Sequence, residues 1–249
     1  MKSISLIITL VLCISCACSQ RPVVPGNNQQ VIPANNKNYT LGRPVVPSPP
    51  KAPVYPKHGN TGATKLSPQD IFATYSPAVF MIFTSSGYER FQGSGFFINS
   101  NGLAVSNYHV FEGTTIGYEV IKLQDGRQYK IKEVIHKDKA NDIMIFTISA
   151  GTTSFKYLPL STRQPRVGDK AYAIGSPRGL ENTFSSGEIS QLRDDNIIQI
   201  SVPIDHGSSG GALINEYGEA IGITSAGLDY SGANLNFAVS TDLVRRYLR

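Results

Sequence analysis

Cysteine is nearly absent from the 249-residue sequence. Its three cysteines, Cys13, Cys16 and Cys18, all lie within the first eighteen residues, so no disulfide can cross-link residues 19–249. Hydrophobic residues make up 41% of the chain, which is ordinary for a globular protein. Glycine (23) and proline (15) are plentiful, which suits a loop-rich β protein better than a helical bundle.

Acidic residues are missing from positions 1–65, which carry seven lysines and arginines. The rest of the chain holds sixteen basic residues against all 18 acidic ones, a net charge of −2, although the whole chain is +5. The basic character therefore belongs to the N-terminal part alone. This distribution argues against a general nucleic-acid-binding face, and we predict no nucleic-acid partner.

Residues 1–19 are predicted to be a signal peptide. A lysine at the second position is followed by an apolar run over residues 4–18 that ends in small residues. The run is shorter than the ~20 residues that a membrane-spanning helix needs, although a transmembrane anchor or a buried strand is the alternative. Cleavage after Ser19 would give a secreted or periplasmic protein. Cleavage before Cys18 would instead allow lipid anchoring at the membrane surface, and both outcomes stay open.

Residues 20–65 are predicted to be a disordered basic linker, rich in proline, asparagine, glycine and lysine. The motif Arg-Pro-Val-Val-Pro occurs at residues 21–25 and again at 43–47. Such a composition buries too little apolar surface to offset the entropy of ordering. Its prolines favour an extended chain that could reach on the order of 140 Å. We interpret it as a solvated spacer; the alternative is a tether whose positive charge contacts an anionic surface.

From residue 66 onward the sequence predicts a helix, a series of short strands and a closing helix. The first helix is expected after Ser67, with Pro68 in its first turn, and ends at Pro77. The closing helix is expected after Ser240 or Thr241. The expected strands cover residues 78–84, 96–98, 103–106, 116–123, 128–135, 143–148, 170–175, 187–192, 197–202, 212–215, 220–225 and 236–239. Because no β-α alternation is present, the pattern predicts an all-β barrel or sandwich.

Ser209 is the best candidate for a nucleophile. It lies in the glycine-rich stretch HGSSGGAL at 206–213. Glycines on both sides permit turns that other residues cannot adopt, and successive backbone amides in such a turn can converge on a developing negative charge. Alone, such a stretch is more often a flexible turn, and a serine hydroxyl also needs a base in order to attack.

His109 is the best candidate for that base, because it lies at the end of an apolar strand that can hold its side chain rigidly. The other histidines are His58, His136 and His206. Asp142 directly precedes the apolar strand 143–146 and is the best candidate to orient the imidazole. Each residue alone is more often structural. Their order, His, Asp, Ser over one hundred residues, favours a catalytic triad.

The chain from about Ser67 to Arg249 resembles the trypsin-like serine proteases, and within them the HtrA/Deg branch. The matching segments are GSGFFI (93–98), SNYHV (106–110), NDIMI (141–145), GSPRGL (175–180), TFSSGEIS (183–190) and IDHGSSGGAL (204–213). The resemblance implies a protease domain over 66–249, built of two six-stranded antiparallel β-barrels with the triad in the cleft between them. It also implies endopeptidase activity on protein or peptide substrates through an acyl-enzyme, and no metal or other cofactor.

The resemblance further implies which residues hold the substrate. The oxyanion hole would be formed by the amides of Gly207 and Ser209, helped by Ser208. The segment Ser225-Ala226-Gly227 would pair with the substrate backbone as an added strand.

The specificity pocket would be built by Pro203, Ile204, Asp205, Thr224 and Gly227. Pro203 stands where trypsin has the acid that selects Arg or Lys, and Ile204 would narrow the pocket. We therefore predict cleavage after small or medium aliphatic residues.

Two departures from the family pattern bear on regulation. Ser208 replaces the aspartate that binds a freed amino terminus in trypsin, so activation by that ion pair is not expected. The sequence stops at Arg249, so no PDZ domain is expected, and the oligomeric state stays open. Two alternatives remain: a binding module at the cell surface on a protease scaffold, or an enzyme inactive until a partner or substrate orders residues 178–187 and 226–236.

Overall fold

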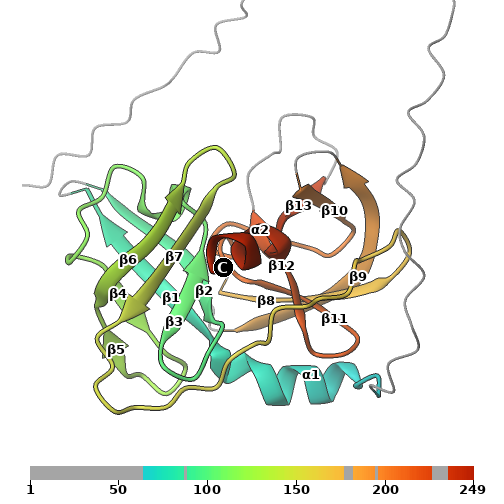
Figure 1. Cartoon of the computed structure of the whole chain (residues 1–249), viewed down its shortest axis with the longest axis horizontal. Helices are drawn as coiled ribbons and strands as arrows, with labels where there is room; N and C mark the ends of the chain where they lie inside the picture. Colours follow the sequence, from blue (N-terminus) through green and yellow to red (C-terminus); the bar gives the residue numbers. More distant parts are fainter. Residues whose placement is uncertain (1–63, 87–88, 177–181, 194–195, 226–234) are drawn as a thin grey trace, which may run out of the picture. The chain divides into compact units, whose positions relative to one another are not determined.

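The described part of the chain begins shortly before the first helix. The computed structural model describes residues 64–86, 89–176, 182–193, 196–225 and 235–249 (Figure 1). All of them belong to one compact unit, Pro53–Arg249. The predicted signal peptide and all but the last two residues of the predicted linker lie outside the described residues. Within the described residues, no helix has the length and apolar character needed to span a membrane.

Helix α1 (Pro68–Tyr75) begins where the sequence predicts it. The Ser67 hydroxyl oxygen accepts the backbone N–H of Asp70 at 3.1 Å and so caps the first turn. Ile71 is the fully buried residue of the helix. A short 3-10 turn, η1 (Ser76–Ala78), then leads directly into the first strand.

The N-terminal half of the unit is a seven-stranded antiparallel sheet of order β5-β4-β1-β2-β3-β7-β6. Its strands are β1 (Val79–Ser85), β2 (Arg90–Phe97), β3 (Leu103–Ser106), β4 (Val120–Lys122), β5 (Gln128–Tyr129), β6 (Ile131–Asp138) and β7 (Ile143–Ile148). The two edge strands, β5 and β6, are separated in the chain by Lys130 alone. Counted as one strand interrupted at Lys130, they give the six strands that were expected.

The C-terminal half is a closed six-stranded barrel of order β10-β13-β12-β11-β8-β9. Its strands are β8 (Lys170–Gly175), β9 (Thr183–Arg193), β10 (Ile197–Ile200), β11 (Ala212–Asn215), β12 (Ala220–Ser225) and β13 (Asn236–Ser240). Helix α2 (Thr241–Tyr247) follows, capped by the Ser240 hydroxyl on the Asp242 N–H. The all-β fold with a short helix at each end is therefore confirmed.

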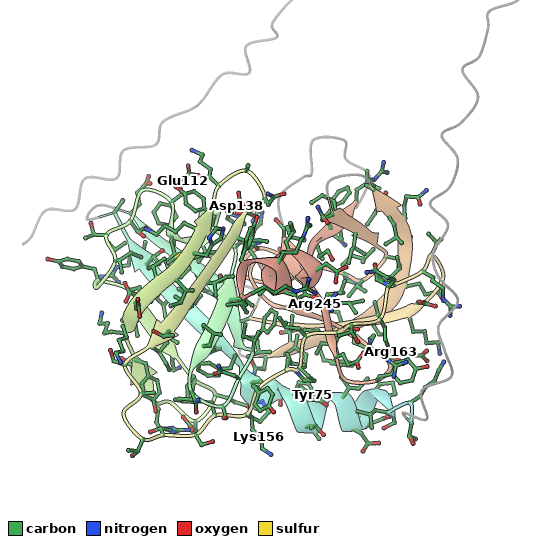
Figure 2. The ribbon with its side chains drawn as sticks, in the orientation of Figure 1. Tyr75, Glu112, Asp138, Lys156, Arg163 and Arg245 are labelled. Carbon is green, nitrogen blue, oxygen red and sulfur yellow. The ribbon has the colours of Figure 1, made fainter. Side chains whose placement is uncertain are left out.

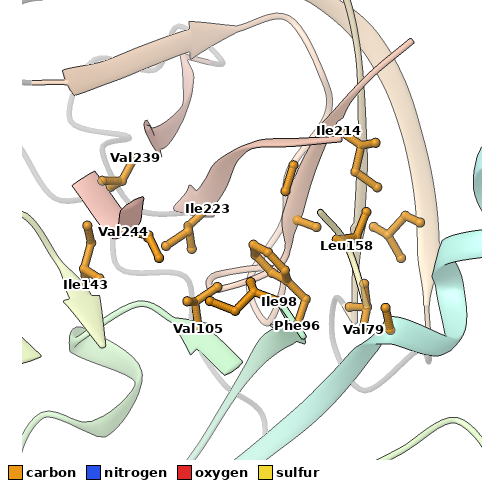
Figure 3. Packing of buried hydrophobic residues seen from close by; sticks show 14 of the residues in the cluster. Val79, Phe96, Ile98, Val105, Ile143, Leu158, Ile214, Ile223, Val239 and Val244 are labelled. Atoms are coloured by element: carbon orange, nitrogen blue, oxygen red, sulfur yellow. The ribbon is translucent and has the colours of Figure 1, made fainter. Parts of the chain in front are cut away.

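Besides the core inside each half, a shared cluster of buried side chains joins the two halves. Phe96 and Val105 of the N-terminal sheet pack in one cluster with Ile223 and Val239 of the barrel and with Val244 of α2 (Figure 3). Each such side chain contributes roughly 1.5–3 kcal/mol when fully buried. This shared core fixes the two halves against each other, and therefore fixes any site made from both.

Several strand boundaries differ from the sequence prediction. β2 begins at Arg90 and not at residue 96. The prediction missed its first residues because Gly93 and Gly95 interrupt the apolar alternation that marks a strand. β4 covers only three residues, since the chain before it turns at Gly117, whose φ is +104°. β9 begins at Thr183 and not at residue 187. One alternative from the sequence was that a partner or substrate must order residues 178–187, but 183–187 are paired with β8 in this structure. Asn182 is also described and buried, whereas residues 178–181 of this segment and residues 226–234 of the second one lie outside the described residues.

Candidate active site

His109 is presented by a turn that immediately follows a buried strand. β3 ends at Ser106, and His109 begins the 3-10 turn η2 (His109–Phe111). The next two residues of η2, Val110 and Phe111, are buried in the N-terminal core. The histidine side chain stays 42% exposed. The backbone is thus fixed by apolar packing while the imidazole faces accessible space.

Asp142 holds this imidazole through both of its carboxylate oxygens. His109 Nδ1 lies 2.8 Å from Asp142 Oδ2, and the His109 backbone N–H donates to Oδ1 at 2.9 Å. An ionised carboxylate can only accept, so the hydrogen bond assigns the proton to Nδ1 and leaves Nε2 as the acceptor. His109 follows the C-terminal end of β3, and Asp142 precedes the N-terminal end of β7. Because these neighbouring strands are antiparallel, the two ends lie side by side.

The backbone at Asp142 adopts an uncommon conformation. Its φ is +55°, in the left-handed region, which aspartate tolerates better than most residues. The buried Asn107 side chain donates to the Asp142 carbonyl at 3.0 Å. This contact holds the peptide that follows the strained residue, so the direction of the carboxylate is determined by the fold.

Ser209 lies in a loop before β11 that is held by backbone hydrogen bonds. The Gly210 N–H donates to the Thr224 carbonyl at 2.8 Å, and the Thr224 hydroxyl donates to the Ser208 carbonyl at 2.7 Å. Gly207 and Gly210 have φ values of +94° and +87°, which explains the need for glycine at both. Ser209 itself is 5% exposed.

The amide of Ser208 is engaged within the loop. It donates to the Asp205 carbonyl at 2.9 Å. The contribution of Ser208 to the oxyanion hole stays a prediction, although this bond already engages its N–H within the loop. Gly207 and Ser209 remain the expected donors.

Ser94 on β2 connects the N-terminal sheet to this loop, although it is not among the site residues predicted from the sequence. Its hydroxyl donates to the Gly207 carbonyl at 2.7 Å and accepts the Ser176 N–H at 2.9 Å. Its backbone N–H donates to the Ser209 carbonyl at 2.7 Å. Ser94 is completely buried. The only sequence signal was its position between Gly93 and Gly95.

Glycines make this close approach possible. A Cβ atom at Gly210 would lie 2.0 Å from the Ser94 carbonyl oxygen, which is backbone and cannot swing away. A Cβ at Gly93 would lie 3.2 Å from the Ser209 carbonyl oxygen and closer still to Val110. The strand and the loop therefore meet at a distance that side chains would prevent.

His109 and Ser209 line the same pocket, which has a volume of about 420 Å³. The other lining residues are Arg90, Phe91, Gln92, Val110, His206 and Gly207. The three predicted triad residues are thus brought to one place, with Asp142 behind His109. His206 lies at this pocket, as a rim residue would.

The predicted specificity residues occupy varied positions. Pro203 is exposed, and Ile204 packs against the core of the C-terminal barrel. Thr224 is buried and supports the serine loop through its hydroxyl, while Ser225 ends β12 opposite Phe237. The predicted substrate-pairing residues Ala226 and Gly227 lie outside the described residues.

Comparisons with known proteins agree with this arrangement. The family described as "Trypsin-like peptidase domain" matches residues 93–223, more than half of the chain. A probable serine protease do-like of Buchnera aphidicola is 38% identical over 170 residues, which cover 63% of this chain and 35% of that protein. The periplasmic serine endoprotease DegP of Escherichia coli K12 is 35% identical over 164 residues, covering 61% of this chain and 34% of DegP.

A solved structure is also similar. The serine endoprotease from Yersinia pestis matches with a TM-score of 0.64 and 28% sequence identity, over 74% of this chain and 65% of that one. The chain spans about a third of the length of the curated relatives named above.

Proposed function

Because the chain belongs to the trypsin-like peptidase family, we propose that it is a serine endopeptidase that hydrolyses peptide bonds in proteins. Ser209 is the nucleophile, His109 is the general base and then the general acid, and Asp142 orients the imidazole. One observation carries this proposal: Asp142 holds His109 by two hydrogen bonds at a pocket that Ser209 also lines.

The reaction follows from the proton on His109 Nδ1. With that proton held by Asp142, Nε2 removes the Ser209 hydroxyl proton as Oγ attacks the carbonyl carbon of the substrate. The imidazolium then gives this proton to the amine nitrogen as the peptide bond breaks, which leaves an acyl-enzyme. Water, deprotonated by the same Nε2, attacks the ester carbon, and the imidazolium then gives that proton to Ser209 Oγ as the ester bond breaks, which releases the acid and the free serine. Each stage returns His109 to its starting state.

Negative charge develops on the carbonyl oxygen of the substrate during both attacks. We assign its stabilisation to the backbone N–H groups of Gly207 and Ser209, because fixed donors about 3 Å from the oxyanion are worth roughly 3–4 kcal/mol each in such sites. The bond from Ser94 to the Gly207 carbonyl supports this role, since it fixes the orientation of a neighbouring peptide plane.

We also propose that the protein cleaves after small or medium aliphatic residues. Pro203 and Ile204 bring no charge that would select a basic residue. Ser225, at the end of β12, is positioned at the start of the segment that would pair with the substrate backbone. Since the DegP relatives are named as periplasmic, we also propose that the chain acts outside the cytoplasm, as the predicted signal peptide requires.

A serine-directed fluorophosphonate probe tests this proposal on the full chain. Wild type is expected to be labelled and to cleave casein, and Ser209→Ala to do neither. Ser190→Ala, on the exposed face of β9, is the matched control and should behave like wild type. Labelling that persists in Ser209→Ala would remove Ser209 from the mechanism. A folded wild-type protein that is never labelled would favour a binding module on a protease scaffold.

A further inference from the structure

The turn between β6 and β7 carries the orienting aspartate. It runs from Asp138 to Asp142, and the Asp138 carboxylate closes it. One carboxylate oxygen accepts the Asn141 backbone N–H at 3.0 Å, and the other accepts the Asn141 side-chain amide at 2.6 Å. Because Asp142 follows directly with a positive φ, the conformation of this turn decides where the catalytic carboxylate points.

The same Asp138 carboxylate is contacted from the other half of the unit. Tyr247, the last residue of α2, donates its hydroxyl proton to Asp138 Oδ2. This bond lowers the pKa of Asp138 from 3.8 to about 2, with the Asn141 bonds contributing less. The carboxylate is therefore a charged acceptor at neutral pH, and hydrogen bonds to charged groups are among the stronger ones in proteins.

The Tyr247 ring is also held in place. His136 on β6 stacks on it, with ring centroids 3.9 Å apart and planes 29° from parallel. At the other end, Leu243 and Val244 of α2 belong to the core shared by both halves. The hydroxyl therefore projects from a helix fixed to the barrel and reaches a turn of the N-terminal sheet.

A second contact on the turn is weaker. Lys139 pairs with Glu112 at 2.6 Å, just after the histidine segment, and Glu112 and Asp138 lie toward the same end of the N-terminal sheet (Figure 2). Both partners are largely exposed, and exposed ion pairs contribute little. It also stays within the N-terminal half. Among the described residues, the Tyr247 bond is the hydrogen bond that ties the turn to α2.

We propose that Tyr247 is a positioning residue for the triad. Its bond to Asp138 holds the turn that bears Asp142 against the helix packed on the barrel that bears Ser209. The bond thereby fixes the position of the imidazole, which Asp142 holds, relative to the Ser209 hydroxyl. The inference rests on the proposed peptidase function for its kinetic consequence, but the geometry of the Asp142–His109 pair can be measured without turnover.

The test is Tyr247→Phe in the full chain, which removes the hydroxyl and keeps the stack on His136. A small displacement of a catalytic group is costly, so kcat per titrated active site should fall on the order of ten-fold while KM stays unchanged. The low-field proton resonance of His109 Nδ1–H should shift or broaden. Tyr118→Phe makes the same chemical change at a tyrosine that is 75% exposed, and should match wild type in both measurements.

A double variant separates positioning from general support of the fold. If the hydrogen bond is the cause, adding Tyr247→Phe to Asp138→Ala, which has no acceptor for the Tyr247 hydroxyl, should lower kcat no further. A Tyr247→Phe protein with a lower melting temperature but unchanged kcat and an unchanged Nδ1–H resonance would overturn the proposal. If wild type has no activity, the proposed function fails separately, and the resonance alone decides whether Tyr247 positions the pair.

Discussion

The two halves of the unit prepare their parts of the site by different means. In the N-terminal sheet, side chains do it: the Asp142 carboxylate holds the His109 ring and backbone. In the C-terminal barrel, the backbone does it: glycines at positive φ and carbonyl–amide bonds shape the loop around Ser209. A proton carrier needs a partner that fixes its tautomer, whereas oxyanion donors need a fixed peptide geometry.

Their cores differ as well. Five phenylalanines pack in the N-terminal core: Phe80, Phe97, Phe111, Phe146 and Phe155. Phe97 is central to them, with ring centroids 4.7 Å from Phe80 and 4.5 Å from Phe155. The described residues of the barrel core are alanine, valine, leucine and isoleucine. The aliphatic side chains pack inside the closed barrel, while the larger rings fill the N-terminal sheet.

The largest effect is expected from breaking the side-chain arrangement. Asp142→Asn should lower kcat on the order of 10⁴-fold, because an amide at this position favours the wrong imidazole tautomer. Stability should change far less, since the Asn side-chain oxygen can still accept the His109 N–H. Steady-state kinetics with a peptide substrate, alongside thermal unfolding, measures both. Activity within ten-fold of wild type would mean that Asp142 does not set the tautomer.

Gly210→Ala is expected to disrupt the backbone conformation of the loop around Ser209. The new Cβ would meet the Ser94 carbonyl at 2.0 Å in addition to the strain of φ +87°, so we expect a loss of about 3–5 kcal/mol in unfolding free energy and loss of probe labelling. Gly126→Ala is the control, because its φ is +86° and no atom lies within 4 Å of the new Cβ. It should cost only about 1–2 kcal/mol. Equal losses would show that strain alone, and not the approach of β2, dictates glycine at 210.

The connection between the two halves is tested by Ser94→Ala. It leaves the half-buried Gly207 carbonyl and the buried Ser176 N–H without the Ser94 hydroxyl, and an unsatisfied buried group costs about 1–3 kcal/mol. Urea unfolding should therefore show a loss of about 2–4 kcal/mol, and kcat should fall with KM little changed. Ser190→Ala again provides the exposed-serine control. A destabilised Ser94→Ala with full kcat would mean that the loop keeps its shape without β2.

The smallest effect concerns acid stability. The pKa of Asp138 is lower in the folded protein than its ordinary 3.8, so the group stabilises the fold above that value. This stabilisation is lost as the pH falls from about 4 toward about 2. Tyr247→Phe removes the main cause of the shift and should flatten this part of the stability curve. Thermal unfolding between pH 5 and pH 2 compares the two proteins, and parallel curves would contradict the assignment.

The sequence predicted what depends on local pattern. β3, β7, β8, β11 and β12 have the bounds that were expected, because each is a short apolar run between turns. His109 and Asp142 were selected from their settings at strand ends, and they do contact each other. Their catalytic roles, with that of Ser209, stay predictions until the kinetic tests are made.

What the sequence could not predict depends on contacts between distant segments. The Ser94–Gly207 bond spans 113 residues and the Tyr247–Asp138 bond spans 109. Neither residue type is unusual in its own strand or helix, and the glycines beside Ser94 do not reveal which distant group it contacts. Only the packing of the two halves reveals these partners.

The position of α2 in the chain has a consequence for biosynthesis. His109, Asp142 and Ser209 are all translated before Thr241–Tyr247. A nascent chain that already contains the three residues still lacks Leu243 and Val244 from its shared core, and Tyr247 from the turn that bears Asp142. Synthesis from the N-terminus therefore leaves the proposed triad without these supports until residues 241–247 have emerged.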